Sequence, residues 1–235
     1  MLPNPLKRKV ARNKGAAGVD GQSVERFAAG AELYLSELHE SLKSGSYRPS
    51  PVKRVDIPKG PGQTRPLGIP SVKDRIVQTA LKMAIEPIFE TAFREGSYGF
   101  RPGRGCKDAL REVDRLKEGD THVVDADLKA YFDSIPHDRL MARVAEKVSD
   151  GRVLDLIEGY LRQDVMEGME RWSPTAGTLQ GAVISPLLAN IYLRRFRGPG
   201  RAVAADRVPA SCVIFVALTL LCPSKNIQFC LANRR

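Results

Sequence analysis

A short segment at residues 123–135, VVDADLKAYFDSI, sets three carboxylates beside residues that favour the interior of a sheet. Its Val and Leu side chains predict a β-strand over about 121–128. Residues two apart in a strand share a face, so Asp125 and Asp127 point the same way. Two unpaired carboxylates on one face repel each other and resist burial. Either this strand ends at the protein surface, with Asp133 and Asp138 capping the next turn, or a hard divalent cation such as Mg²⁺ neutralises the pair.

Charge is distributed unevenly along the 235 residues, whose net formal charge is +10. Residues 1–117 hold 22 Lys and Arg against 13 Asp and Glu, whereas residues 118–193 hold 7 against 13. Residues 194–235 hold 8 against 1. A basic first half beside an acidic middle suits an enzyme that neutralises phosphates with one region and holds cations with another. A solvated basic surface would carry the same charges, so this pattern alone leaves nucleic-acid binding open.

The sequence carries no signal for export or for a membrane. The residues after Met1 turn polar and basic at once, and no apolar run reaches the roughly 20 residues of a spanning helix. The four cysteines form no Cys-X-X-Cys pair, which argues against a metal cluster or a disulfide framework. We therefore expect a cytoplasmic protein that does not contact a membrane.

Periodicity predicts an α+β fold, in which helices cover a small sheet. Two short strands flank the turn KGPGQT, a long helix follows over 71–93, and the apolar run VIFVALTLL is a strand candidate. Beyond Leu193 the sequence shows no clear helical or strand period. Further helices are predicted within 13–47 and at 106–119, 136–148, 152–165 and 182–193, and a short extended piece is predicted at 169–176.

Five sequence blocks occur in the order and at the spacing of one known family. They are NKGAAGVDG, IPKGPGQTRPLGIPSVKDRIVQTALKMAIEPIFE, SYGFRPGRG, DADLKAYFDSIPHD and GTLQGAVISPLLANIYL. Together they resemble the reverse transcriptases encoded by group II introns, over about residues 12–193. The resemblance implies a right-hand polymerase, with basic, helical fingers and an N-terminal extension in 1–117 and a partial palm sheet with packed helices in 118–193. It also implies RNA-templated DNA synthesis, intron mobility and binding of intron RNA.

The resemblance assigns the metal site to the opening segment. Asp127 takes the place of the motif A metal ligand, with the carbonyl of Leu128 nearby and Asp125 at a position where the family varies. In such enzymes two Mg²⁺ ions clamp the attacking oxygen and the triphosphate. Asp127 is therefore the expected catalytic residue, and Mg²⁺ is the expected cofactor. The implied partners are an RNA template or intron RNA, a DNA primer or target, and deoxynucleoside triphosphates.

Five further residues are implied in nucleotide binding. Lys59 and Arg65 flank the KGPGQT turn, where a point charge and a guanidinium fork can fold over a triphosphate; a solvated basic turn is the alternative. Phe132 corresponds to an aromatic gate that excludes a ribose 2′-hydroxyl, and a core aromatic is the alternative. Gln180 and Gly181 belong to GTLQG, which resembles motif B, where glycine lets the backbone approach a nucleotide.

Template or RNA contacts are implied at two loops. Arg101 and Arg104 lie on SYGFRPGRG, and Lys14 begins the KGAAGVDG loop of the N-terminal extension. Cations on loops can bind phosphates without reading sequence. A plain basic loop is the alternative in each case.

The chain departs from the family pattern in motif B and after it. Leu179 stands where the family more often has Pro, and the sequence contains no Asp-Asp pair, although the family carries a Tyr-X-Asp-Asp hairpin after motif B. We expect an incomplete copy that polymerises poorly or not at all. The alternatives are a non-catalytic RNA-binding remnant and a reverse transcriptase of a related retroelement or defence locus. The abrupt Arg-rich change at 194–235 is typical of an out-of-frame translation.

Overall fold

The structure is a computed structural model, and it groups the chain into two compact units, each discontinuous in sequence. The first unit comprises Met1–Phe93 and Ala130–Ala202, and the second comprises Arg94–Lys129 and Val203–Arg235. The regions expected from the sequence, 1–117, 118–193 and 194–235, are polymerase subdomains and a tail, whereas these two units are groups of residues in mutual contact. The expected regions therefore stay a prediction. The residues that the structure describes are 15–60, 62–117, 122–126, 128, 130–194 and 212–216.

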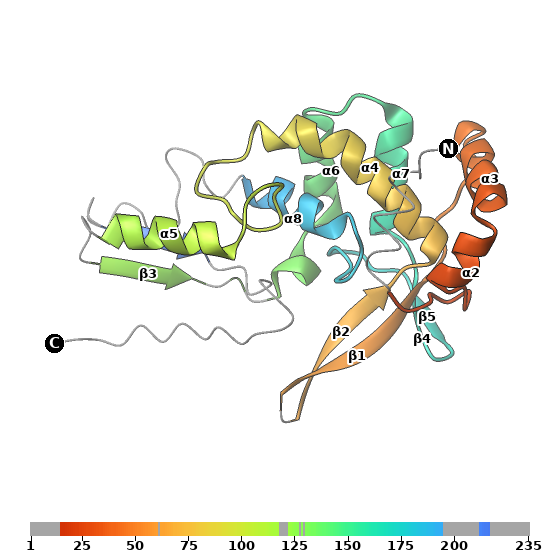
Figure 1. The fold of residues 1–235 in the computed structure, drawn as a ribbon, viewed down its shortest axis with the longest axis horizontal. Helices are drawn as coiled ribbons and strands as arrows, with labels where there is room; N and C mark the ends of the chain where they lie inside the picture. Colours follow the sequence, from red (N-terminus) through yellow and green to blue (C-terminus); the bar gives the residue numbers. More distant parts are fainter. Residues whose placement is uncertain are drawn as a thin grey trace. The chain divides into compact units, whose positions relative to one another are not determined.

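The first unit combines a small mixed sheet with helices, which confirms the α+β class. Its strands form one sheet in the order β2-β1-β4-β5, and Figure 1 shows β1 and β2 as a long hairpin that extends beyond the helices of this unit. The strands are β1 (Val52–Gly60), β2 (Gln63–Ile69), β4 (Val165–Glu167) and β5 (Glu170–Trp172). The helices are α2 (Val24–Ala29), α3 (Ala31–Lys43), α4 (Val72–Glu90), the 3-10 turn η1 (Tyr131–Ser134), α6 (His137–Ala145), α7 (Gly151–Leu161) and α8 (Ser185–Leu193).

The β1–β2 hairpin confirms the two strands predicted around KGPGQT. The strands run antiparallel, and their register places Ile57 opposite Arg65. On its other side β1 pairs in parallel with β4, with Val52 opposite Val165. Strand β5 lies within the extended piece predicted at 169–176. Strand β4 was not predicted: the helix expected at 152–165 ends at Leu161 instead, and so short a strand shows no period-two alternation. The hairpin that carries Arg65 is thus attached to a segment distant in sequence.

Helix α4 confirms the long helix predicted over 71–93. Ser71 is its N-cap, and the Ser71 hydroxyl oxygen accepts a hydrogen bond from the backbone amide of Asp74 at 3.1 Å. Such a cap satisfies one of the free amides of the first turn. Pro87 lies inside the last turns, close to the end at Glu90. The helix therefore starts and stops near the signals that the sequence provides.

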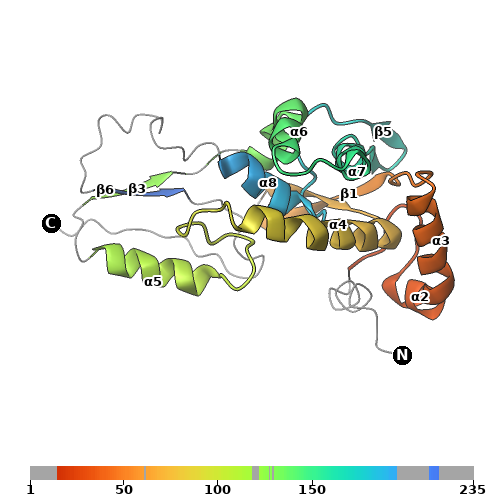
Figure 2. The same ribbon diagram turned by 90° about the horizontal axis from the view of Figure 1, so that it is seen from above.

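The core of the first unit lies where the sheet and the helices meet. Helix α8 contacts both α6 and α4, and α6 contacts α7 (Figure 2). No helix within the described ranges is long and apolar enough to cross a membrane. The most deeply buried apolar side chains include Val52, Phe89, Ile135, Leu140, Val144, Ile157, Ile184 and Leu188.

The second unit contains α5 (Cys106–Lys117), β3 (His122–Ala126) and β6 (Cys212–Val216). Strands β3 and β6 pair in parallel, with Val124 opposite Ile214. Strand β3 confirms the strand predicted over about 121–128. Strand β6 covers the first part of the apolar run VIFVALTLL, which confirms that run as a strand candidate.

Candidate nucleotide and template site

The β1–β2 hairpin and the GTLQG loop meet at one side-chain contact. Arg65 Nε donates a hydrogen bond to Oε1 of Gln180 at 3.1 Å, and both residues are partly buried. Because this bond uses Nε, the two terminal NH₂ groups of the guanidinium can still grip an anion in a bidentate manner. The structure therefore brings together two of the predicted nucleotide-binding residues, although they lie far apart in the sequence.

Lys59 belongs to the same hairpin. Its backbone lies in β1, next to an irregularity in the register between Pro58, opposite Thr64, and Gly60, opposite Gln63. The Lys59 side chain lies outside the described residues. The predicted contact of its amine with a triphosphate stays a prediction.

Backbone hydrogen bonds fix the GTLQG loop to β2 and to η1. The Gly68 amide donates to the carbonyl oxygen of Gln180 at 2.7 Å, and the Thr178 amide donates to the carbonyl oxygen of Phe132 at 2.7 Å. Each bond joins the loop to an element with a predicted nucleotide-binding residue. Gln180 and Phe132 are therefore held in one continuous hydrogen-bonded frame.

Two buried side chains bind the backbone at the start of this loop and two residues after its end, and neither was predicted from the sequence. Gln78 on α4 accepts a hydrogen bond from the Val183 amide at 2.8 Å, and His137 Nε2 donates to the carbonyl oxygen of Gly177 at 2.8 Å. Gln78 is fully buried and His137 is 8% exposed. A single Gln inside a helix and a single His at a helix start give no sequence signal, because their partners are distant backbone groups.

Two glycines of the loop leave no space for a side chain. Gly181 has φ +102°, and a Cβ there would overlap the Gly68 carbonyl oxygen and lie 2.8 Å from Leu67 Cδ1. Gly177 has φ +90°, and its Cβ would lie 2.9 Å from Asp133 Cα. Left-handed backbone of this kind favours glycine. Gly181 thus lies close to β2 and Gly177 lies close to η1. The predicted approach of Gly181 to a nucleotide stays a prediction.

Asp133 lies beside the Arg65–Gln180 contact. Burial raises the pKa of its carboxyl group, while Arg54, the hydrogen-bonding Gln180 side chain and Arg65 act in the opposite direction. The sequence offered Asp133 only as a residue of the turn after the strand. Its place among two guanidinium groups and an amide could not be read from a local pattern.

Phe132 is buried in η1, with 5% of its surface exposed. Its ring packs edge-on against Tyr131, with centroids 5.9 Å apart and an interplanar angle of 85°. Tyr131 is fixed in turn by a hydrogen bond from its hydroxyl to the Ala189 carbonyl oxygen at 2.8 Å. The deep burial agrees with the core alternative, and the gate assignment of Phe132 stays a prediction.

The predicted metal ligands fall only partly within the described residues. Asp127 lies outside them, and Asp125 is placed by its backbone alone in β3. Leu128 is 38% exposed. Among the side chains that the structure describes, no group of three or more His, Cys, Asp or Glu could hold a metal ion. An Mg²⁺ site at Asp127, Asp125 and the Leu128 carbonyl stays a prediction.

Arg101 is used inside the SYGFRPGRG loop. It is 7% exposed, and its NH1 group donates to the carbonyl oxygens of Arg94 at 2.6 Å and Ser97 at 2.9 Å. A buried guanidinium that bridges backbone carbonyls stabilises the shape of a loop. The template contact of Arg101 stays a prediction, and these bonds favour a structural role.

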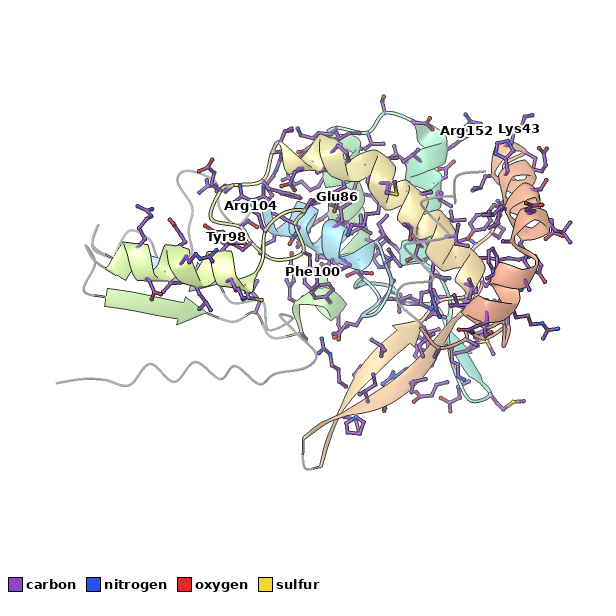
Figure 3. All side chains as sticks on the ribbon, viewed as in Figure 1. Lys43, Glu86, Tyr98, Phe100, Arg104 and Arg152 are labelled. Atoms are coloured by element: carbon purple, nitrogen blue, oxygen red, sulfur yellow. The ribbon has the colours of Figure 1, made fainter. Side chains whose placement is uncertain are left out.

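Arg104 lies closer to the surface of the same loop. Its NH1 group donates to the carbonyl oxygen of Glu95, and its guanidinium carbon lies 5.7 Å from the centroid of the Tyr98 ring, as Figure 3 allows the reader to follow. A guanidinium at this distance over a ring makes a cation–π contact. The predicted template contact of Arg104 is compatible with this position and stays a prediction.

The loop that follows Lys14 is anchored on α4, although Lys14 itself lies outside the described residues. Arg75 Nε donates to the Pro70 carbonyl oxygen at 3.0 Å, and its NH2 group donates to the Ala16 carbonyl oxygen. Burial lowers the pKa of Arg75, and Asp20 partly offsets this effect. The sequence reading missed this anchor. A template contact by Lys14 stays a prediction.

A buried carboxyl group, Asp74, ties α4 to the start of β1 and the end of α7. It accepts hydrogen bonds from the Tyr47 hydroxyl, from the Ser50 amide at 3.2 Å and from Gln163 Nε2 at 3.3 Å. Tyr47 also shares a 2.8 Å hydrogen bond with the Tyr160 hydroxyl. Burial raises the pKa of Asp74, which the hydrogen bonds only partly offset. This network supports the base of the hairpin.

The reverse transcriptase (RNA-dependent DNA polymerase) family matches residues 57–215, more than half of the chain. The chain belongs to this family. The match starts in β1 and ends in β6, so it includes the hairpin, β3 and the GTLQG loop. It also continues past Leu193, where the block-by-block resemblance ends.

Two related proteins confirm the resemblance to group II intron proteins. The chain is 43% identical over 192 residues to Protein YkfC of Escherichia coli K12, covering 78% of this chain and 50% of that protein. It is 38% identical over 184 residues to the group II intron-encoded protein LtrA of Lactococcus lactis subsp. cremoris, covering 77% of this chain and 30% of that protein. This chain therefore spans half or less of the length of these relatives.

A solved structure agrees with this reverse transcriptase fold. The partial Cas6-RT-Cas1–Cas2 complex contains a chain that superposes with a TM-score of 0.52 at 23% sequence identity, covering 82% of this chain and 33% of that one. At this identity the likeness supports the fold alone. Fold and family are thus established by independent comparisons.

Proposed function

We propose that this chain forms the nucleotide- and template-binding part of a group II intron reverse transcriptase, which copies RNA into DNA for intron mobility and binds intron RNA. The observation that carries the proposal is the hydrogen bond between Arg65 and Gln180. It joins the hairpin assigned to the triphosphate with the loop assigned to motif B. Two elements that must close on one nucleotide gain from being held in position beforehand.

Each predicted residue then has a role in holding the nucleotide. Arg65 offers its two NH₂ groups and Lys59 its ammonium to the triphosphate. Gln180 and Gly181 border the base and sugar, and Phe132 lies beneath the sugar as the gate against a 2′-hydroxyl. Positioning and charge neutralisation make up most of what a protein contributes to phosphoryl transfer.

Asp127, the Leu128 carbonyl and Asp125 are the residues that we propose to hold Mg²⁺. When bound, the metal would polarise the attacking oxygen and neutralise phosphate charge. The RNA template would follow the basic loops, with Arg104 and Lys14 as phosphate contacts and Arg101 shaping its loop. The primer is DNA, and the incoming substrates are deoxynucleoside triphosphates.

Non-catalytic RNA binding is the second candidate function. It is favoured by one observation, the absence of any Asp-Asp pair from the sequence. A two-metal site that lacks these carboxylates holds its cations weakly, since fewer negative charges offset them. The basic residues that bind RNA do not depend on that pair.

Primer extension tests the catalytic proposal. We expect the present chain to extend a DNA primer on an RNA template poorly or not at all. A version completed after Leu193 with a family palm hairpin containing Tyr-Ala-Asp-Asp should extend it with Mg²⁺. In that version Arg65→Ala should lower kcat/KM by about 10- to 100-fold, because hydrogen bonds to charged groups contribute about 1.5–3 kcal/mol.

The control for this experiment is Arg162→Ala, which removes an exposed Arg paired with Glu158 on α7. It should extend the primer as well as the completed parent, and Asp127→Ala should extend it no better than background. Normal extension by Arg65→Ala would show that Arg65 does not bind the nucleotide. No extension by the completed parent would leave RNA binding as the function.

The origin of residues 194–235 can be tested on the coding DNA. We propose that part of this basic stretch is read out of frame from a damaged or mis-assembled gene. The family match and β6 pass Leu193, so some family sequence persists there. One of the other two frames beyond the Leu193 codon should encode Tyr-Ala-Asp-Asp or a near variant. If neither frame encodes it, residues 194–235 are the natural continuation of this protein. Non-catalytic RNA binding would then be the better supported function.

A further inference from the structure

Phe100, on the loop at residues 94–105 before α5, is in an unusual conformation. Its φ is +56°, in the left-handed region where bulky side chains are rare and strained. A glycine would adopt this conformation freely, and the loop contains glycines on both sides of Phe100. An aromatic residue at this position therefore needs a compensating interaction.

Packing within the protein covers the Phe100 side chain only in part. Phe100 is 38% exposed, and Figure 3 shows it on the loop that also presents Tyr98 and Arg104. The next residue, the buried Arg101, fixes the loop through the Arg94 and Ser97 carbonyl oxygens. The loop therefore presents a partly exposed aromatic ring on a strained backbone.

The surroundings of the ring are basic. Residues 94–107 contain four Lys and Arg against one Glu. Arg94 and Lys107 are exposed, and Arg104 lies over the Tyr98 ring. Exposed rings beside cations are what single-stranded nucleic acids bind, because bases stack on the rings while the cations attract phosphates.

We propose that Phe100 is a base-stacking residue for single-stranded RNA, with Arg104 as the adjacent phosphate contact and Arg101 as the internal support of the loop. The inference rests on the proposed RNA-binding function and names the surface that performs it. Paired bases are not available for such stacking, so the surface should distinguish single strands from duplexes.

The full chain and an unstructured CAA-repeat RNA of about 15 nucleotides, within the usual site sizes for single strands, provide the test. Fluorescence anisotropy over a series of salt concentrations gives the affinity and its salt slope. Phe100→Ala should weaken binding about tenfold with an unchanged slope, because stacking releases no counterions. Arg104→Ala should weaken binding and reduce the slope by about one phosphate contact. Phe100→Tyr should bind like the parent.

Controls separate stacking from folding. Phe100→Gly relieves the left-handed strain, so it should unfold at an equal or higher denaturant concentration than the parent while binding RNA as weakly as Phe100→Ala. Leu33→Ala removes another exposed apolar side chain, on α3, and should leave binding unchanged. Binding to duplex RNA should not change in Phe100→Ala.

Two results would overturn the inference while leaving the proposed function intact. One is parent-like binding of the single strand by Phe100→Ala, and the other is an equal loss on duplex RNA. If the parent chain itself binds no RNA at low salt, the proposed RNA-binding function fails together with this surface. Equal losses on single-stranded DNA and RNA would support stacking without reading of the 2′-hydroxyl.

Discussion

Gly181→Ala is expected to destabilise the first unit by at least about 3 kcal/mol. The φ of +102° is strained for any residue with a Cβ, at a cost of about 1–3 kcal/mol. The added Cβ would also overlap the Gly68 carbonyl oxygen. That oxygen cannot move away easily, because the Gly68 amide donates to the Gln180 carbonyl oxygen at 2.7 Å. Strain and steric overlap therefore act together.

Urea unfolding followed by circular dichroism measures this effect, and Gly168→Ala is the matched control. Gly168 has φ +60° on the turn between β4 and β5, but a Cβ there meets nothing within 4 Å. The control should lose only about 1–2 kcal/mol from the left-handed backbone. Similar losses in the two variants would show that the contact between the GTLQG loop and β2 is not tight.

Asp74→Ala should lower the free energy of unfolding by about 3 kcal/mol or more at neutral pH. Asp74 is 1% exposed, and its removal leaves the Ser50 amide without an acceptor. The Tyr47 hydroxyl and Gln163 Nε2 each lose one of two hydrogen-bond partners. Each buried donor left unsatisfied costs about 1–3 kcal/mol. The control is Glu37→Ala, which removes an exposed carboxylate of α3 that pairs with Lys73 of α4. This change should cost under about 1 kcal/mol.

Asp74→Asn should cost less than Asp74→Ala, and its cost should decrease as the pH rises. Because burial raises the pKa of Asp74, the folded protein keeps this proton to a higher pH than the unfolded chain does. Stability contributed by the carboxyl group is therefore full at low pH and declines as the pH rises through its folded pKa. Unfolding of both proteins from acidic to neutral pH tests this. A cost that grows with pH would contradict it.

The sequence predicts the regular elements of this fold well where they carry their own signals. The cap at Ser71 and the apolar stripe of α4, and the turn between β1 and β2, are local features with local causes. Strand β4 lacks them: three residues cannot show an alternation, and Val165 is a strand residue because it pairs with Val52 of β1 and Trp172 of β5. Tertiary pairing decided those residues.

The residues of the candidate site also divide into those that the sequence indicated and those that only the structure shows. Family resemblance, and not physical pattern, selected Arg65 and Gln180, which the structure joins by a hydrogen bond. The supports of the loop, Gln78 and His137, could not be predicted because they bind backbone atoms of a loop distant in sequence. Arg101 on the SYGFRPGRG loop is buried and donates to two backbone carbonyl oxygens. No local sequence pattern indicated this burial, and its template contact stays a prediction.

The parallel pairing of β1 with β4 also governs how this unit can be made on the ribosome. The edge of β1 stays open until residues 165–167 have been synthesised, and an open edge invites pairing with other chains. The contact between Val52 and Val165 closes a large loop of chain, which slows folding. A nascent chain that pauses between the two strands thus exposes the unpaired backbone groups of the β1 edge, which favour aggregation. Expression with a chaperone present should therefore raise the yield of folded protein.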